Sequence, residues 1–135
     1  MNFLIKNKTY FYTHLIVYLT LLHGIGYFIV KYFFQVETEY GIRPHSSQTI
    51  WRSLHVVLSP LLVFIFGVLL KDHVIKMLRF SKRKRKSGVL LITTLSVIIL
   101  TGYLIQVAPT PIFQKINLYT HNALSFVFAI AYLFH

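Results

Sequence analysis

The chain contains no cysteine, and only three of its 135 residues are acidic. Without cysteine it cannot form disulfides, thiolate metal sites or the covalent haem linkage of a Cys-x-x-Cys-His motif. The acids are scattered and none lies in a long apolar stretch, so paired-carboxylate catalysis has no basis. A phosphate-binding loop is also missing, because "HGIGY" is the richest glycine fragment. No hydrolytic class of enzyme fits this set of residues.

Apolar residues dominate what is there. Hydrophobic residues make up 56% of the chain, aromatic residues 16% and charged residues 13%, whereas soluble domains hold roughly 25% charged residues. Four apolar stretches cover approximately residues 10–34, 50–70, 89–108 and 116–135, and each is close to the ~20 residues that a membrane-crossing helix needs. The sequence therefore predicts an all-α, four-helix transmembrane bundle that forms a single domain over residues 1–135.

Basic residues predict how this bundle is oriented. The formal net charge is +11, which in a soluble chain would suggest nucleic-acid binding. Here eight of the 14 basic residues lie in "KDHVIKMLRFSKRKRKSG", between the second and third stretches. The positive-inside rule places this segment, and with it Lys6 and Lys8, in the cytoplasm. We therefore expect both termini to be cytoplasmic, the "KRKRK" run to act as a topology signal, and no nucleic-acid partner.

Histidines are the unusual polar residues of this chain. Ionisable side chains are costly inside a membrane and usually face the interior of a bundle. Six of the seven histidines lie in or at the ends of the apolar stretches. The seven are His14, His23, His45, His55, His73, His121 and His135.

Helical spacing sorts these histidines into pairs. His55 and His73 are 18 residues apart, about five turns, so both face one side of the second helix. His121 and His135 are 14 residues apart, about 40° short of four turns, and share a face of the fourth helix. His14 and His23 are nine residues apart and point in opposite directions.

The predicted depth of each histidine in the membrane then pairs those of the second helix with those of the fourth. His55 and His121 both lie roughly 7 Å inside the outer boundary, and His73 and His135 lie at the inner ends. Two opposed neutral imidazoles in an apolar slot between helices are the ligands of b-type haem. The sequence thus predicts one or two haem b groups, with two favoured, although the vertical spacing differs between the helices, at roughly 27 Å and roughly 21 Å.

Other polar and small residues have weaker assignments. Arg52 lies near the outer histidine pair and is a candidate partner for haem propionates, with interfacial anchoring as the alternative. His45, in the loop sequence "RPHS", is a candidate to bind a propionate or a quinone. His23 could line a quinone pocket or bond a backbone carbonyl, and His14 is a reserve ligand for the inner site. Small residues permit close approach of a macrocycle or of a neighbouring helix; they are Gly24, Gly26, Gly67 and Gly102.

Roughly residues 37–135 resemble a group of small bacterial four-helix membrane proteins related to b-type cytochromes. The resemblance rests on two stretches, "EYGIRPHSSQTIWRSLHVVLSPLLVFIFGVLLKDHV" and "SGVLLITTLSVIILTGYLIQVAPTPIFQKINLYTHNALSFVFAIAYLFH". In that group the second and fourth helices carry paired histidines, and an "SG…TGY" third helix precedes an "H…H" fourth helix. The resemblance implies bis-histidine haem b, a bacterial inner membrane location and a Pro-His match at His45. The matching ligand positions are His55, His73, His121 and His135.

Three functions remain open from the sequence. The first is electron transfer through haem, with quinone or a partner redox protein as the exchange partner and a homo-oligomer possible; whether the chain is an enzyme subunit is undecided. The second is a histidine-lined proton or metal transporter, although such sites usually add carboxylates or sulfur that these helices lack. The third is a cofactor-free structural subunit of a larger membrane redox complex. The matched depths of the histidines on the second and fourth helices favour electron transfer.

Overall fold

The computed structural model describes residues 3–80 and 85–135. It is mostly helical, as predicted, and divides into two compact units, Met1–Val68 and Leu69–His135. Each unit is described below by itself. Residues 82–84, the first three of the "KRKRK" run, lie outside the described residues, so the topology signal expected there stays a prediction.

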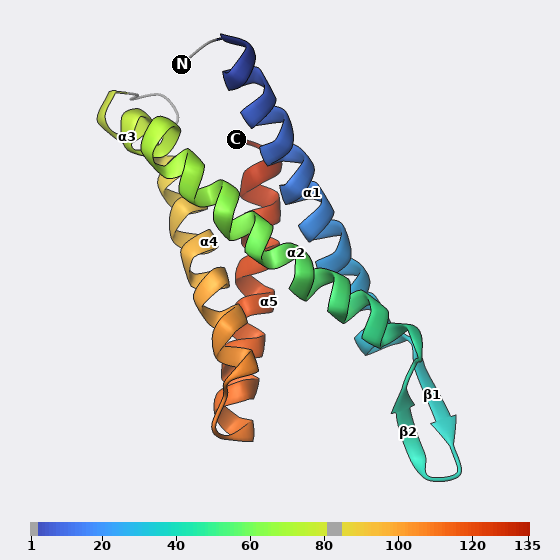
Figure 1. Cartoon of the computed structure of the whole chain (residues 1–135). Helices are drawn as coiled ribbons and strands as arrows, with labels where there is room; N and C mark the ends of the chain where they lie inside the picture. The colour runs from blue at the N-terminus through green and yellow to red at the C-terminus, as the bar shows by residue number, and fades with distance from the viewer. Residues whose placement is uncertain (1–2, 81–84) are drawn as a thin grey trace. The chain divides into compact units, whose positions relative to one another are not determined.

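The first unit contains two long helices joined by a hairpin (Figure 1). Helix α1 (Phe3–Phe33) ends where the strands begin, and α2 (Ser47–Leu69) follows them. Strands β1 (Gln35–Thr38) and β2 (Gly41–Pro44) pair antiparallel between these helices, in a segment for which the sequence predicts no strand. A two-residue connection joins them, and the φ of 101° at Gly41 is one that only glycine adopts without strain.

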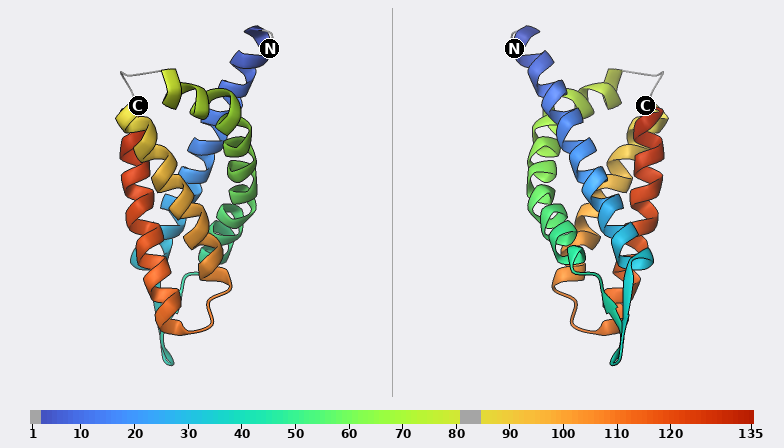
Figure 2. Two further views of the ribbon diagram at one scale, coloured as in Figure 1. Left: turned by 90° about the vertical axis from the view of Figure 1, so that its left-hand side faces the viewer. Right: turned by 90° about the vertical axis from the view of Figure 1, so that its right-hand side faces the viewer.

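The second unit begins where α2 loses its regular winding. A π-helical turn, η1 (Leu70–Ile75), leads into the short α3 (Lys76–Phe80). Two long helices follow, α4 (Arg85–Gln106) and α5 (Pro111–Leu133), which lie side by side and antiparallel (Figure 2). Thr110 caps α5, because its side-chain oxygen accepts the Phe113 backbone N–H at 3.2 Å and a proline occupies the first turn.

Buried polar side chains in these helices donate hydrogen bonds to backbone carbonyls of the same helix. Each donates to a carbonyl three or four residues earlier, which satisfies the donor where no water is present. Large apolar side chains instead face outward; Phe64 is 71% exposed and Leu100 58%. Apolar surfaces on long helices are what a lipid environment requires. The buried polar residues are Thr13, Thr20, Thr94, Thr101 and Asn117.

Within the described residues, three helices are long and apolar enough to cross a membrane: Lys8–Phe33, Ser47–Leu69 and Arg85–Gln106. These segments agree with the first three predicted stretches, apart from shifts of a few residues at the ends. The fourth predicted stretch is helical, as α5, but it does not reach the same hydropathy. Polar residues in its first half lower the average, namely Asn117, Thr120, His121 and Asn122. A fourth crossing, and the location of the termini, therefore stay predictions.

Candidate functional site

His121 on α5 forms the best-defined side-chain contact between two helices of the second unit. Its Nδ1 atom lies 3.0 Å from the Ile98 carbonyl oxygen and 3.2 Å from the Thr101 hydroxyl oxygen, both on α4. The Thr101 hydroxyl donates its own hydrogen to the Val97 carbonyl at 2.8 Å. Since both neighbours of Nδ1 act as acceptors, Nδ1 carries the imidazole hydrogen and the lone pair is on Nε2.

A glycine makes this approach possible. A Cβ atom at Gly102 would lie 3.3 Å from Cε1 of His121 and 3.6 Å from its Nδ1. Such a contact is tight, so any larger residue would push the ring away from α4. Gly102 thus fulfils the close-approach role that the sequence predicts, and its neighbour along the chain, Thr101, supplies the hydrogen-bonding group.

A similar arrangement of an imidazole beside a hydroxyl and a glycine occurs at the next histidine along the chain, His135. The Nδ1 atom of His135 lies 2.9 Å from the Ser87 hydroxyl oxygen, and a Cβ at Gly88 would lie 3.9 Å from its Cε1. Ser87-Gly88 and Thr101-Gly102 are fourteen residues apart on α4, and the two histidines, His121 on α5 and His135 just beyond its last residue, are also fourteen apart. Because the helices are antiparallel, equal spacings bring each hydroxyl–glycine pair to one histidine. We call each such pair a hydroxyl–glycine step.

His55 also packs against a glycine, within the first unit. A Cβ at Gly24 on α1 would lie 3.1 Å from Cε1 of His55 and 3.3 Å from its Nδ1. The ring also hydrogen-bonds the backbone of Thr20, one turn earlier on the same helix. Three histidines therefore place the Cε1 side of the ring against a glycine: His55 in the first unit, and His121 and His135 in the second.

His73 lies in η1, where it is half-buried. A π-helical turn does not advance by 100° per residue, so the arithmetic that aligns His73 with His55 ends at Leu69. The predicted pairing of these two residues on one helix face thus loses its basis, while the role of His73 as a ligand stays a prediction. Single π-helical turns inside helices occur frequently at functional sites.

The two histidines of α1 bond or stack within their own helix. Nδ1 of His23 lies 2.8 Å from the Leu19 carbonyl oxygen, which is the second of the two roles that the sequence offers for it. Its ring centre is 5.6 Å from that of Trp51 on α2. His14 stacks on Tyr18, with ring centres 6.3 Å apart.

His45 caps the start of α2. Its Nδ1 accepts the Ser47 backbone N–H at 3.2 Å and lies 2.8 Å from the Ser47 hydroxyl, while its carbonyl accepts the Gln48 N–H at 2.9 Å. An Nδ1 that accepts leaves the hydrogen on Nε2 in the neutral ring. His45 is thus a donor at Nε2, a tautomer suited to a carboxylate or a quinone oxygen. Arg52, the other predicted propionate partner, is exposed on α2 and interacts with Tyr27.

Sequence reasoning identified the histidines but not their partners on α4. Thr101 and Ser87 look like ordinary helix residues, and the Ile98 carbonyl has no signature in a sequence. The signal that could have found them is the equal spacing of "SG" and "TG" with the two histidines that follow. Neither protein-family models, nor curated proteins, nor solved structures gave a match to this chain.

Proposed function

We propose that this chain is a b-type haem protein of a bacterial inner membrane that carries electrons, with His121 of α5 and His135, two residues after α5 ends, as iron ligands. The observation that carries the proposal is the repeated hydroxyl–glycine step of α4. It holds both imidazoles by the same ring edge, with Nδ1 against an oxygen of the neighbouring helix.

This geometry supports ligation because iron takes an imidazole through the nitrogen that has no hydrogen. Metal-binding histidines almost always donate their other ring N–H to a carbonyl, carboxylate or similar acceptor, which fixes the tautomer and raises the basicity of the ligand. The bond from His121 Nδ1 to the Ile98 carbonyl is of this kind. An imidazole that acts only as a hydrogen bond between helices is the competing explanation.

The other predicted ligands are His55 and His73, one from each unit, and His45 and Arg52 are the candidates to hold propionates. Haem, when bound, supplies an iron that exchanges single electrons between its ferrous and ferric forms. The protein's part is to fix the imidazoles, to surround the macrocycle with apolar side chains and to neutralise the propionates. A quinone or a partner redox protein would exchange the electrons.

Absorption spectroscopy of purified full-length variants tests this proposal. We expect sharp reduced haem b bands in the unmodified protein, a loss of signal in His121→Ala, and a full signal in His23→Ala. The last is a matched control, because His23 bonds its own helix at Leu19. A protein without haem bands favours the transporter or the structural subunit instead. Full bands in His121→Ala would show that this residue is not a ligand.

A further inference from the structure

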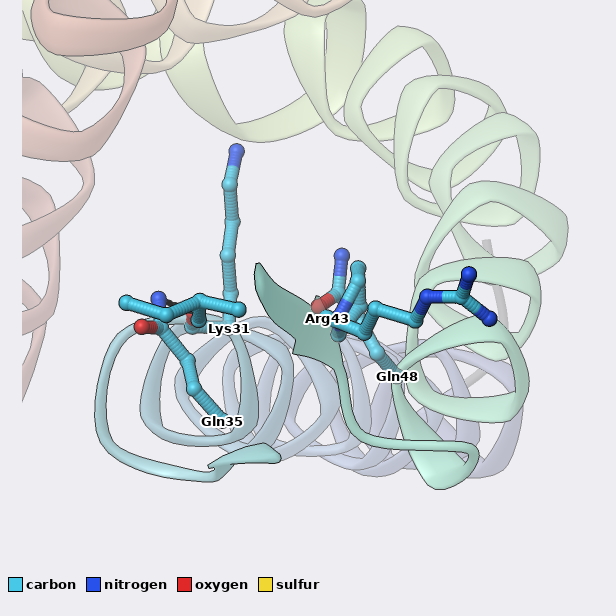
Figure 3. A pocket seen from close by; sticks show the side chains of 6 residues that line it. Lys31, Gln35, Arg43 and Gln48 are labelled. Atoms are coloured by element: carbon cyan, nitrogen blue, oxygen red, sulfur yellow. Dashed lines mark hydrogen bonds between the residues drawn. The ribbon is translucent and has the colours of Figure 1, made fainter. Parts of the chain in front are cut away.

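A small basic pocket lies where the first unit's hairpin meets its two helices (Figure 3). Its volume is about 200 Å³. Lys31 rises from the last turn of α1 on one side, and Arg43 of β2 lies on the other side beside Gln48 of α2 (Figure 3). None of the lining side chains is acidic; they are Lys31, Gln35, Ile42, Arg43, Pro44 and Gln48.

The hairpin that forms one wall is held by local bonds. The Thr38 hydroxyl donates to the Gly41 carbonyl at 2.7 Å across the turn, and β1 pairs with β2 from Gln35 opposite Pro44 to Thr38 opposite Gly41. The His45 cap then fixes the step from β2 into α2. Because strand, cap and helix are all fixed by hydrogen bonds, the lining side chains start from a defined backbone.

Both cations of the pocket are oriented by aromatic rings. Nζ of Lys31 lies 5.7 Å from the ring centre of Tyr27 and 5.5 Å from that of Tyr32, and the Arg43 guanidinium lies 5.6 Å from that of Tyr40. Such contacts attract the cation but add no negative charge. No acidic side chain lines the pocket to neutralise Lys31 and Arg43, and a third favourable field comes from the N-terminal end of α2 at Gln48.

The position of the pocket, at the ends of two candidate membrane spans, indicates which ligands could reach it. Lys31 lies two residues before the end of the candidate span Lys8–Phe33, and Gln48 is the second residue of the candidate span Ser47–Leu69. These ends correspond to the depth of lipid headgroups. A Lys31 that only complements the C-terminal end of the α1 dipole is the simpler explanation, but it requires neither Arg43 nor the amides opposite.

We propose that this pocket binds a phosphate group, from an anionic lipid headgroup or from soluble phosphate. Arg43 supplies planar paired donors that match phosphate oxygens, Lys31 supplies a point charge, and the Gln35 and Gln48 amides supply neutral donors. The proposal goes beyond haem binding and does not depend on it, because none of these residues is a predicted iron ligand.

Lipid retention by the purified full-length protein tests it. We expect phosphatidylglycerol to be retained over phosphatidylcholine in native mass spectrometry, and each of Lys31→Gln and Arg43→Gln to lower that retention by about fivefold, the effect of one basic residue at a membrane surface. Lys115→Gln is the control, because Lys115 is exposed near the start of α5 and lies outside the pocket. Arg43→Lys keeps the charge but loses the paired donors, so it should lower retention less than Arg43→Gln does, and residual binding shows that the fold survives substitution there.

A second experiment distinguishes a lipid headgroup from soluble phosphate as the source of the phosphate group. Binding of inorganic phosphate to the lipid-depleted protein, weakened by the same two variants, would support a soluble ligand. Phosphatidylglycerol retention without phosphate binding would support a lipid site. Equal retention of both lipids together with no phosphate binding, or an equal loss in Lys115→Gln, would overturn the proposal. Haem spectra of Lys31→Gln should remain unchanged, so that a failure here is distinct from a failure of haem binding.

Discussion

The Nδ1 atom of His121 lies 3.2 Å from the hydroxyl oxygen of Thr101, across the contact between α5 and α4. That hydroxyl passes its own hydrogen to the Val97 carbonyl, so the imidazole is the donor of the pair. A donated N–H makes the opposite nitrogen of the ring a better electron donor. The effect of Thr101 on any iron held by His121 is therefore electronic as well as steric.

Thr101→Val is expected to raise the reduction potential of the haem that we propose His121 binds. Valine keeps the shape but removes one acceptor from Nδ1–H, so the imidazole becomes less basic and stabilises ferric iron less. The shift should be modest, because the Ile98 carbonyl remains in place. Potentiometric titration of the haem bands measures it, and Thr101→Ser should restore the original value.

Thr94→Val is the matched control for that potential. Thr94 is buried on the same helix, but its hydroxyl bonds the Leu90 and Leu91 carbonyls of α4 itself. An equal shift in Thr94→Val would mean that the change at Thr101 acts through general packing of α4. No shift in either variant would remove Thr101 from the site.

Gly102→Ala should lower haem content, and Gly67→Ala should not. An added Cβ at Gly102 lies 3.3 Å from Cε1 of His121, so the ring must move away from α4 and weaken its bonds to Ile98 and Thr101. Apart from the backbone of α2 itself, no atom in the described part of the chain lies within 4 Å of an added Cβ at Gly67, and alanine there should instead stabilise the helix by about 0.5–1 kcal/mol. The ratio of haem to polypeptide, with thermal melting, compares the two variants.

Gly26→Ala tests the packing of the first unit without reference to haem. A Cβ at Gly26 of α1 would overlap the ring of Trp51 on α2. Forced overpacking typically costs about 1–3 kcal/mol, so the variant should unfold at a lower temperature. Trp51 is the only tryptophan of the chain, and its fluorescence reports this contact directly. An unchanged melting curve with an unchanged emission maximum would show that α1 and α2 do not pack at this point.

Single cysteines can test the fourth membrane crossing, because the chain contains none of its own. We expect Thr38→Cys and Thr110→Cys to react with an impermeant reagent from outside the cell, and Met77→Cys to react only after lysis. A cysteine added after His135 should behave like Met77→Cys if α5 crosses. Labelling of that added cysteine from outside would show that α5 does not cross.

The sequence predicts the long helices well because each is specified locally by a long, predominantly apolar run. The run from Ser47 to Leu69 needs no tertiary information to be recognised. The hairpin is harder, because Gln35–Thr38 and Gly41–Pro44 are exposed and show no buried face from which strand alternation could be inferred. The π-helical turn at Leu70–Ile75 has no residue pattern of its own, and it removes the arithmetic that aligns His73.

The sequence can predict which helix face carries the histidines, but not which residues of a neighbouring helix they contact. Periodicity predicts that His121 and His135 share one face of the fourth helix, although α5 ends two residues before His135. Only the register between α4 and the α5 segment brings Thr101 to the first and Ser87 to the second. Register depends on close packing at Gly102 and Gly88, which no single-helix argument contains.

Haem content of the purified, unmodified protein tests the account most directly. The haem released from a known amount of polypeptide should correspond to one or two b-type groups per chain, because the Ile98 carbonyl holds His121 in the ligating tautomer and His135 offers a second imidazole beside Ser87. A protein that is folded, judged by its helical circular dichroism and by Trp51 emission, and that still contains no haem after expression with excess haem precursor would contradict it.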